Sequence, residues 1–244
     1  MINLIIDIGN SRTKVALFRN GKLEKSYYVE YLSFEKFLEI KADYPEIKKA
    51  IISTVKEKPD LLLEQMSEKL ETLVFLDHNT KIPIENCYKT PETLGKDRLA
   101  AVVGANYINH ESDILVIDAG TAITYDFITK EKKYKGGFIT PGLSMRFKAL
   151  HQFTSKLPLL NSNEPGEYYG DDTNSSIIGG IQLGLEGEIN SIFKYFSTFS
   201  ENILIFLTGG DTKYFEKLLK SYNFVSLEIT LIGLNRILEY NHIN

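Results

Sequence analysis

The segment Asp7-Ile8-Gly9-Asn10-Ser11-Arg12-Thr13 follows the apolar run Leu4-Ile5-Ile6, and a second segment, Asp118-Ala119-Gly120-Thr121-Ala122-Ile123-Thr124, follows Leu115-Val116-Ile117. Each segment joins an apolar strand to an acidic residue, a glycine, small or hydroxyl residues and another apolar run. The copies lie about half a chain apart, far beyond the roughly 20–50-residue periods of solenoids and propellers. This spacing predicts two duplicated domains, 1–112 and 113–244, with a ligand site between them.

Composition and charge exclude several classes of protein. The 244 residues include 28 basic and 32 acidic side chains and 43% hydrophobic residues, which is ordinary for a globular protein. The net charge of −4 predicts no general attraction to nucleic acid or to an anionic membrane. The start Met1–Asp7 lacks the basic and apolar regions of a signal peptide, so we expect a cytoplasmic protein. With Cys87 as its one cysteine, the chain forms no intrachain disulfide or cysteine zinc cluster.

The order of apolar runs and turn signals predicts an α/β protein in which each half repeats one scheme. The hairpin signal Asn20-Gly21 joins two of the first three predicted strands. Alternation of later strands with helices predicts a partly parallel sheet with flanking helices in each half. The strands are expected at 3–9, 12–18, 22–30, 50–53, 72–76, 113–118, 122–129, 133–139, 202–207 and 223–227. Helices are expected at 33–41, 59–70, 98–109, from 142 to about 152, at 174–196, 211–220 and 229–239.

The two acidic turns have the residue types of a phosphate site. An aspartate after a strand often only caps a turn, but two matched copies favour a function. Glycine lets the backbone approach a ligand, successive N–H groups can surround phosphate oxygens, and Asn10, Ser11 and Thr121 add short polar groups. If Asp7 and Asp118 face one site, their repulsion calls for a cation, and Mg²⁺ typically combines carboxylates with substrate phosphates.

Two further motifs lie near predicted helix starts. Gly95-Lys96-Asp97-Arg98 leaves two interpretations open, because Asp97 is either a helix N-cap or a group that accepts a proton from a substrate hydroxyl. In the second interpretation, Arg98 holds a substrate carboxylate. Thr208-Gly209-Gly210-Asp211 follows an apolar strand and opens a helix, where α/β proteins place a nucleotide against backbone. The sequence contains neither a Walker A nor a Gly-x-Ser-x-Gly motif, which disfavours P-loop kinases and triad hydrolases.

Taken together, these motifs resemble those of type III pantothenate kinases. The resemblance rests on the doubled turns, on Gly95–Arg98 between them and on Gly136-Gly137-Phe138-Ile139-Thr140-Pro141-Gly142 after them, in the family's order. It implies the acetate and sugar kinase, Hsc70 and actin superfamily, with two ribonuclease H-like domains around a nucleotide cleft. It also implies transfer of the ATP γ-phosphate to pantothenate, giving 4′-phosphopantothenate in the first step of coenzyme A synthesis. The implied cofactors are Mg²⁺ and a monovalent cation, K⁺ or NH₄⁺.

The resemblance also implies a role for individual residues. Asp97 would be the general base, Asp7 would organise magnesium, and Asp118 would bind the monovalent cation. The residues implied in ATP binding are Asp7, Ile8, Gly9, Asn10, Ser11, Arg12, Thr13, Lys14 and Thr121. Those implied in pantothenate binding are Tyr88, Gly95, Lys96, Asp97, Arg98 and Thr173.

The same resemblance implies a homodimer in which the neighbouring subunit completes the pantothenate pocket, near the long helix 174–196. Two alternatives from the superfamily stand beside this interpretation. One is a non-catalytic actin-like scaffold or regulatory protein, against which the intact Asp7, Asp97 and Asp118 speak. The other is a kinase acting on acetate or a sugar, whose chains are usually much longer.

Overall fold

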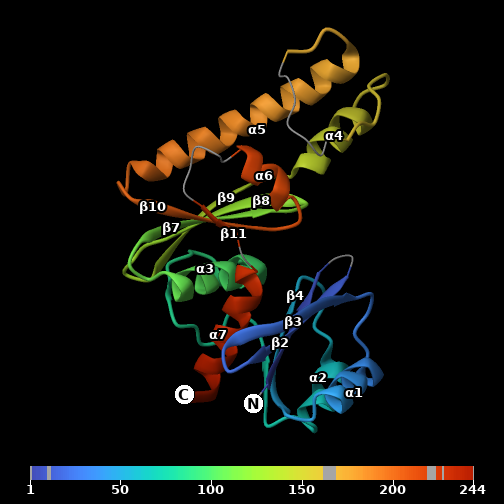
Figure 1. Cartoon of the computed structure of the whole chain (residues 1–244), viewed down its shortest axis with the longest axis vertical. Helices are drawn as coiled ribbons and strands as arrows, with labels where there is room; N and C mark the ends of the chain where they lie inside the picture. Colours follow the sequence, from blue (N-terminus) through green and yellow to red (C-terminus); the bar gives the residue numbers. More distant parts are fainter. Residues whose placement is uncertain (1, 10–11, 162–168, 219–223, 227, 244) are drawn as a thin grey trace. The chain divides into compact units, whose positions relative to one another are not determined.

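The computed structural model describes residues 2–9, 12–161, 169–218, 224–226 and 228–243 (Figure 1). The chain forms two compact units, one made of Met1–Asn109 with Glu228–Asn244 and the other of His110–Leu227. The C-terminal segment therefore belongs to the first compact unit, although the sequence analysis counted it with the second domain. The division into homologous domains at residues 112 and 113 stays a prediction.

The sheet of the first unit begins with the predicted meander. Its strands are β1 (Ile2–Ile8), β2 (Thr13–Arg19), β3 (Lys22–Val29), β4 (Ile47–Thr54) and β5 (Thr72–Phe75), paired in the order β3-β2-β1-β4-β5. The first three strands are antiparallel, whereas β1, β4 and β5 run parallel. Asn20 and Gly21 have φ values of 51° and 78°, so this turn has the left-handed backbone that the Asn-Gly signal predicts.

Helices cover both faces of this sheet. The helices are α1 (Phe34–Asp43), α2 (Asp60–Ser67), α3 (Lys96–Ile108) and α7 (Ile229–Ile243). Ile2, Leu4 and Ile6 alternate along β1 and join one core cluster with residues of α1 and α2. The sequence analysis missed the two-residue strand β6 (Glu85–Asn86) and the 3₁₀ helix Pro91–Thr93, because both are too short to show a period.

Close packing of α3 against α7 explains why the C-terminal helix belongs to the first unit. A Cβ atom on Gly104 would lie 2.0 Å from the carbonyl oxygen of Ile229, and one on Gly233 would lie 1.8 Å from that of Ala100. Asn3 on β1 donates a buried hydrogen bond of 2.8 Å to the side chain of Asn235 on α7. Two glycines thus bring the helix backbones together, and a polar pair fixes α7 on the face of β1 that carries Asn3.

The second unit repeats the strand topology of the first. Its strands are β7 (Asp113–Ala119), β8 (Ala122–Ile128), β9 (Lys133–Pro141), β10 (Ile203–Thr208) and β11 (Phe224–Ser226), and they pair in the order β11-β10-β7-β8-β9. Again the first three strands are antiparallel, while β10 pairs parallel to both β7 and β11. This matched topology confirms the duplication that the doubled motif predicted and the ribonuclease H-like fold that the family resemblance implied.

The helices of the second unit are α4 (Leu143–Gln152), α5 (Thr173–Ser197) and α6 (Thr212–Leu218). Helix α5 lies along one face of the second sheet (Figure 1), and its residues Ile181, Leu185 and Ile189 enter the core cluster with Leu115 and Ile117 of β7. The helix begins with a capping box, because Asp172 accepts from the amides of Asn174 and Ser175 while the Ser175 hydroxyl pairs with Asp172. Parts of the predicted loop 161–172 and helix 211–220 lie outside the described residues.

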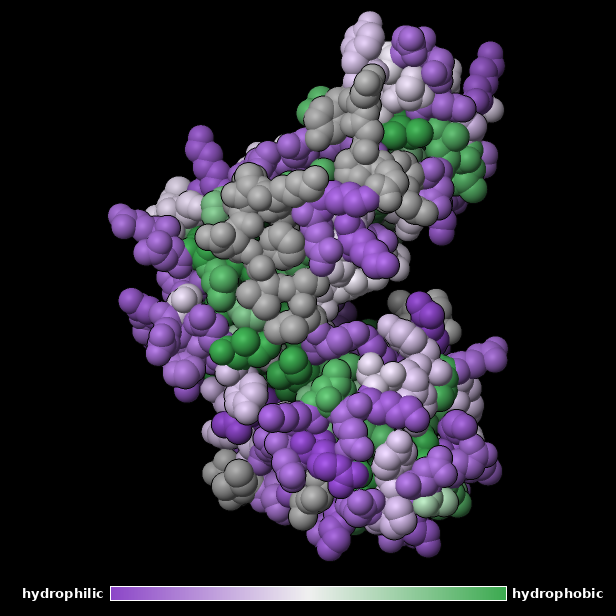
Figure 2. Space-filling view, in the orientation of Figure 1, coloured by the Kyte–Doolittle hydropathy of each residue, from purple (hydrophilic) through white to green (hydrophobic). Residues whose placement is uncertain are grey.

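Most of the protein face visible in Figure 2 is hydrophilic, with separate hydrophobic patches, which is usual for a globular surface. Among the described residues of the second unit, four aromatic side chains are more than half exposed, namely Phe153, Tyr169, Tyr195 and Phe199. Among the described helices, none combines the length and the apolar character that crossing a bilayer requires.

Candidate functional site

The two motif aspartates occupy matched places in the two sheets. Asp7 lies near the carboxyl end of β1 and is opposite Ser53 of the parallel strand β4. Asp118 lies near the carboxyl end of β7 and is opposite Thr208 of the parallel strand β10. Each carboxylate is therefore next to a hydroxyl residue of the neighbouring strand, at the strand end where ligands of open α/β sheets bind.

The turns after the two aspartates differ by one residue. Asp7 is opposite Lys14 in the antiparallel ladder, whereas Asp118 is opposite Thr124. Thr13, which matches Thr124 in the sequence motif, is instead opposite Ile8. The two motif threonines thus take different positions in their ladders, and only the register of the strands reveals it.

The surroundings of Asp7 disfavour its charged form. Burial and the nearby charge of Asp97 raise the pKa of Asp7 to about 6, while a hydrogen bond from Ser53 and the charge of Lys14 act in the opposite direction. Two carboxylates from separate elements of the first unit, β1 and α3, therefore lie close enough to interact. Ser53 was not among the predicted site residues, because the sequence shows only that it ends the predicted strand 50–53.

Two cationic side chains of the first turn lie beside Tyr28 of β3. The Arg12 guanidinium is 4.1 Å from the centre of the Tyr28 ring, and Lys14 Nζ is 5.3 Å from it, both within cation–π range. Lys14 also forms an ion pair with Glu228, which directly precedes α7. Asn10 and Ser11, which were predicted to bind ATP, lie outside the described residues.

The Gly95–Arg98 motif forms the start of α3, but Asp97 is not its N-cap. Gly95 occupies the cap position without a side-chain hydrogen bond, and the Asp97 carboxylate accepts a 2.8 Å hydrogen bond from the amide of Arg98. A Cβ atom on residue 95 would lie only 2.6 Å from Asp97 Oδ1, so glycine makes room for this carboxylate. The simple capping explanation of Asp97 therefore fails.

Other predicted pantothenate residues gather around the same helix start. The buried Arg98 guanidinium lies 5.6 Å from the centre of the Tyr88 ring, which brings two predicted substrate residues together. Lys96 Nζ lies 4.6 Å from the Phe75 ring centre, and burial lowers the pKa of Lys96 while the charge of Asp77 raises it. One end of α3 thus presents a carboxylate, a guanidinium and an aromatic ring.

In the second unit, two glycine-bearing segments pack on the turn 118–121. The amide of Asp211 donates to the carbonyl of Ala119 at 2.9 Å, and the amide of Gly142 donates to the carbonyl of Thr121 at 3.0 Å. Gly209 has φ of 101° and lies against Ala119 and Asp118. The motifs around residues 142 and 209, which are distant in sequence, therefore both support the second acidic turn, and Thr121 remains exposed there.

Oxygen atoms suited to a cation lie around Asp118. Its ladder partner Thr124 has a buried hydroxyl oxygen without a hydrogen-bond partner. Among the described residues, no group of three or more His, Cys, Asp or Glu side chains is arranged to hold a metal ion.

Thr173 is the first residue of α5 and is distant in sequence from the acidic turn 118–121 of the same unit. It lines an open groove of about 1320 Å³ between α4 and α5, together with Arg146, Tyr169 and Asp172. Its side chain is exposed. The contact with pantothenate that the resemblance implied stays a prediction.

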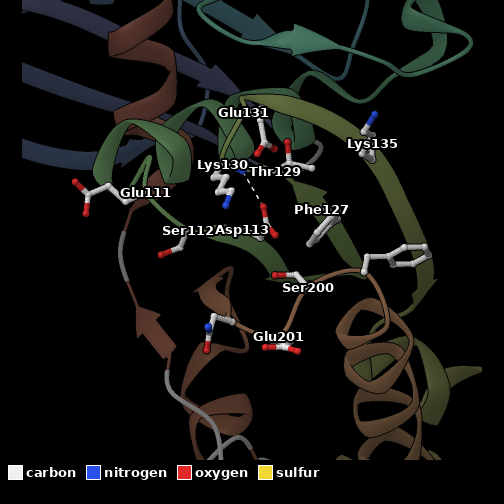
Figure 3. A pocket seen from close by; sticks show the side chains of 12 residues that line it. Glu111, Ser112, Asp113, Phe127, Thr129, Lys130, Glu131, Lys135, Ser200 and Glu201 are labelled. Atoms are coloured by element: carbon white, nitrogen blue, oxygen red, sulfur yellow. Dashed lines mark hydrogen bonds between the residues drawn. The ribbon is translucent and has the colours of Figure 1, made fainter.

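Another pocket, of about 840 Å³, lies at the end of the second sheet away from the acidic turn 118–121 (Figure 3). It is lined by Asp113, the first residue of β7, by Asn202 before β10 and by the β8–β9 turn, where Asp113 accepts a 2.8 Å hydrogen bond from the amide of Lys130. Because Asp118 and Thr208 lie at the other ends of these two strands, this pocket is not the predicted site.

Comparison with known proteins places this geometry in a family. Residues 3–195 match the family model of type III pantothenate kinase. A type III pantothenate kinase from Bacteroides fragilis is 44% identical over 241 residues, which cover 99% of both chains. The chain belongs to the type III pantothenate kinase family.

Solved structures place the same fold more widely. A conserved protein from Campylobacter jejuni assigned to the Baf family superposes with a TM-score of 0.64 and 23% identity over 99% of this chain and 100% of that one. A ROK hexokinase from Thermus thermophilus superposes with a TM-score of 0.58 and 11% identity over 100% and 99%. At these identities the likeness concerns the fold alone, which this chain shares with both proteins.

The residues that the family resemblance implied in substrate and cation binding are divided between the two compact units. Asp7, Asp97, Arg98 and Tyr88 all belong to the first compact unit, and contacts or charge interactions link Asp7 with Asp97 and Arg98 with Tyr88. The implied ATP and cation residues Thr121 and Asp118, by contrast, belong to the second unit. The sequence motifs found these groups, but they did not reveal their supports, Ser53, Tyr28 and Glu228.

We predict that Gly209→Ala destabilises the second unit through the acidic turn. A Cβ atom there would lie 2.4 Å from the Ala119 carbonyl oxygen and 2.5 Å from Asp118 Oδ1, at a φ that side chains rarely adopt. The expected loss is about 2 kcal/mol or more in urea unfolding. The matched control is Gly210→Ala, because a Cβ atom there meets nothing within 4 Å, and its effect should stay within about 0.5 kcal/mol. Equal effects of the two substitutions would contradict the close packing.

A second prediction concerns the pH dependence of stability. The folded pKa of Asp7, about 6, exceeds its ordinary value of 3.8, so folding is favoured while the carboxyl is protonated and loses stability as pH rises through this window. Asp7→Asn should therefore stabilise the chelator-treated, nucleotide-free protein by about 1–3 kcal/mol at pH 8. The difference should vanish near pH 4.

Thermal unfolding of wild type and Asp7→Asn between pH 4 and pH 8 would measure this effect. The exposed Asp43 provides the control, and Asp43→Asn should show no comparable dependence on pH. An advantage of Asp7→Asn that is equal at both ends of the range would rule out ionisation of Asp7 as its cause.

Proposed function

We propose that the protein carries out the reaction for which its family is named, the ATP-dependent phosphorylation of pantothenate that begins coenzyme A synthesis. The observation that supports this most directly is the environment of Asp97, whose carboxylate interacts with that of Asp7 and adjoins Arg98 at the start of α3. One carboxylate would orient the phosphate donor and its cation, and the other would face the acceptor hydroxyl. We place the reaction in the cytoplasm, where ATP is available.

Phosphoryl transfer needs alignment and charge neutralisation more than covalent help from the protein, because its transition state is loose. In this proposal the backbone and side chains of residues 7–14 contact the ATP phosphates, with Arg12 and Lys14 as the positive charges. Thr121, exposed in the second acidic turn, is the further ATP contact that the family resemblance implies. Tyr28 and Glu228 hold the Arg12 and Lys14 side chains near the first turn before ATP binds.

The acceptor would bind at the start of α3. Arg98 has a fixed guanidinium next to the Tyr88 ring and is suited to a bidentate contact with the pantothenate carboxylate. Lys96, with its lowered pKa, and the backbone at Gly95 line the same helix end. Asp97 then accepts the proton of the primary hydroxyl as its oxygen bonds to the γ-phosphorus, while the bond from that phosphorus to the β,γ-bridging oxygen breaks and ADP leaves.

The residues fit both implied cations. Asp7 is a carboxylate whose ionisation is disfavoured by burial and by Asp97, so a nearby Mg²⁺ would lower that cost. Asp118, together with the unsatisfied hydroxyl oxygen of Thr124, offers the hard oxygen ligands that a monovalent cation takes. Such cations, when bound, would neutralise charge on the phosphates.

The central experiment follows phosphate transfer by the purified protein. With ATP, Mg²⁺ and K⁺, we expect pantothenate-dependent formation of 4′-phosphopantothenate, detected by its mass. Asp97→Asn should bind ATP and pantothenate but lower kcat by about 10²–10⁴-fold, since a general base is lost. Glu92→Gln, an exposed change in the preceding 3₁₀ helix, should retain activity.

Each outcome of this experiment separates one class of function from another. ATP binding without a pantothenate product would point to another acceptor, such as acetate or a sugar. Failure to bind ATP would favour the scaffold or regulatory alternative. Full turnover by Asp97→Asn would remove Asp97 from the role of base.

The proposal includes a homodimer, in which Thr173 of one subunit would complete the pantothenate pocket of the other. Helix α5 has an exposed strip suited to close contact, with Leu183 exposed and open space around Gly180, Gly184 and Gly187. We expect sedimentation to give twice the chain mass of 27.8 kDa and Leu183→Glu to shift the protein toward monomer. A wild-type protein that stays monomeric at micromolar concentration would contradict this arrangement.

A further inference from the structure

Glu188 of α5 is the centre of a polar network in the second unit that has no part in the proposed chemistry. Its Oε1 atom accepts hydrogen bonds from Tyr125 at 3.0 Å and from Thr140 at 2.7 Å, and its Oε2 atom accepts one from Arg146 at 2.6 Å. These three donors come from β8, β9 and α4. One carboxylate therefore ties together every element that surrounds the end of β9.

The network is well shielded. The side chains of Arg146 and Glu188 are only 18% and 21% exposed, and Tyr125 is fully buried. Burial and the charge of Glu188 raise the pKa of Tyr125, while the charge of Arg146 lowers it, and the tyrosine stays protonated as a donor. Because these groups are largely removed from water, losing one partner leaves the others poorly satisfied.

Arg146 extends the network to the backbone at the end of β9. Its Nε atom donates to the carbonyl of Pro141 at 2.9 Å, while its own amide donates to the carbonyl of Gly142 at 3.1 Å. Thr140 and Pro141 are the ladder partners of Ile123 and Ala122, the residues that follow the second acidic turn. Glu188 thus fixes the last two residues of β9 through one hydroxyl and one guanidinium.

The end of β9 in turn contacts the acidic turn itself. The amide of Gly142 donates to the carbonyl of Thr121, and a Cβ atom on Gly142 would lie 2.2 Å from the carbonyl oxygen of Gly120. A side chain would not fit here, because the backbone at Gly142 packs directly against that at Gly120. A shift of residues 140–142 therefore has to move the acidic turn 118–121. A continuous series of contacts leads from Glu188 to Thr121.

We propose that Glu188 is a positioning residue for the ATP-binding turn of the second unit, acting through Arg146 and residues 140–142 on Gly120 and Thr121. The proposal rests on the proposed contact of Thr121 with ATP. Its effect should be larger for the nucleotide than for pantothenate, since the proposed pantothenate contacts at the start of α3 belong to the other unit and, of the proposed pantothenate residues, Thr173 alone lines a groove with Arg146. Groups that position an active-site residue through hydrogen bonds typically change affinity or activity by about 10–100-fold when lost.

The test replaces Glu188 by glutamine. The Glu188→Gln side chain has nearly the same shape but no charge, and its single oxygen can accept on one side only, so either Arg146 or the two hydroxyls lose their acceptor. We expect the Kd and KM for ATP to rise about tenfold, while KM for pantothenate changes less than about twofold. Tyr125→Phe and Thr140→Val each remove one donor with little change of volume and should shift ATP affinity in the same direction by less.

The matched control is Tyr134→Phe. Tyr134 lies near the other end of β9, opposite Ile128, and donates a buried hydrogen bond of 2.6 Å to a carboxylate, that of Asp126. Its loss should lower thermal stability without changing ATP affinity. Thr140→Ser, which keeps the hydroxyl, should retain the ATP affinity that Thr140→Val loses.

Several results would overturn the proposal. These are unchanged ATP affinity in Glu188→Gln, equal loss of ATP affinity in Tyr134→Phe, or equal changes in KM for both substrates. If Glu188→Gln does not fold, the two milder variants decide by the same criterion. If wild type binds ATP but forms no product from pantothenate, the proposed function fails, whereas the binding constants still decide the role of Glu188.

Discussion

Parallel pairing of the first strand of each unit, β1 with β4 and β7 with β10, determines where the two acidic turns lie. Because β1 pairs with β4 and β7 with β10, each acidic turn emerges beside a hydroxyl residue, Ser53 or Thr208. A slip of one residue in either pairing would turn the carboxylate to the other face of its sheet. The hydrophobic alternation along β1, with Ile2, Leu4 and Ile6 in one core, prevents that slip.

The features that form the site are costly for the fold. Asp7 is a carboxylate whose charge is disfavoured by its surroundings, Thr124 has a buried hydroxyl oxygen without a partner, and Gly209 adopts a left-handed backbone. Asp7 and Thr124 would be better replaced by apolar or uncharged residues if stability alone mattered. Their presence at the ends of the two central strands is the expected sign of a binding site, because groups left unsatisfied in the free protein can be satisfied by a ligand.

Local patterns in the sequence predicted most of the helices, strands and turns of the fold. The Asn20-Gly21 turn, the alternation along the strands and the doubled motif were each readable from neighbouring residues, and the structure has them where they were expected. The position of α7 was not readable, because its contact with α3 depends on Gly104 and Gly233, which are far apart in the sequence. Neither helix shows a signal for the other.

The same distinction holds for the site. Asp7, Asp97 and Asp118 stand in short motifs and could be named in advance, and a family resemblance gave them roles. Their supports could not, since Ser53, Glu228 and Glu188 are ordinary polar residues until the strand register and the helix packing bring them to their partners. The one-residue difference between the two turns also became visible only in the ladders, where Lys14 and Thr124 take equivalent places.

The return of α7 to the first unit has a consequence for synthesis on the ribosome. The face of α3 around Ala100 and Gly104 is covered by the last helix of the chain, so the amino-terminal half cannot complete its core while the second half is still being made. Domains usually fold in the order in which they emerge. Here the half that emerges first can complete its core only after α7 has left the ribosome.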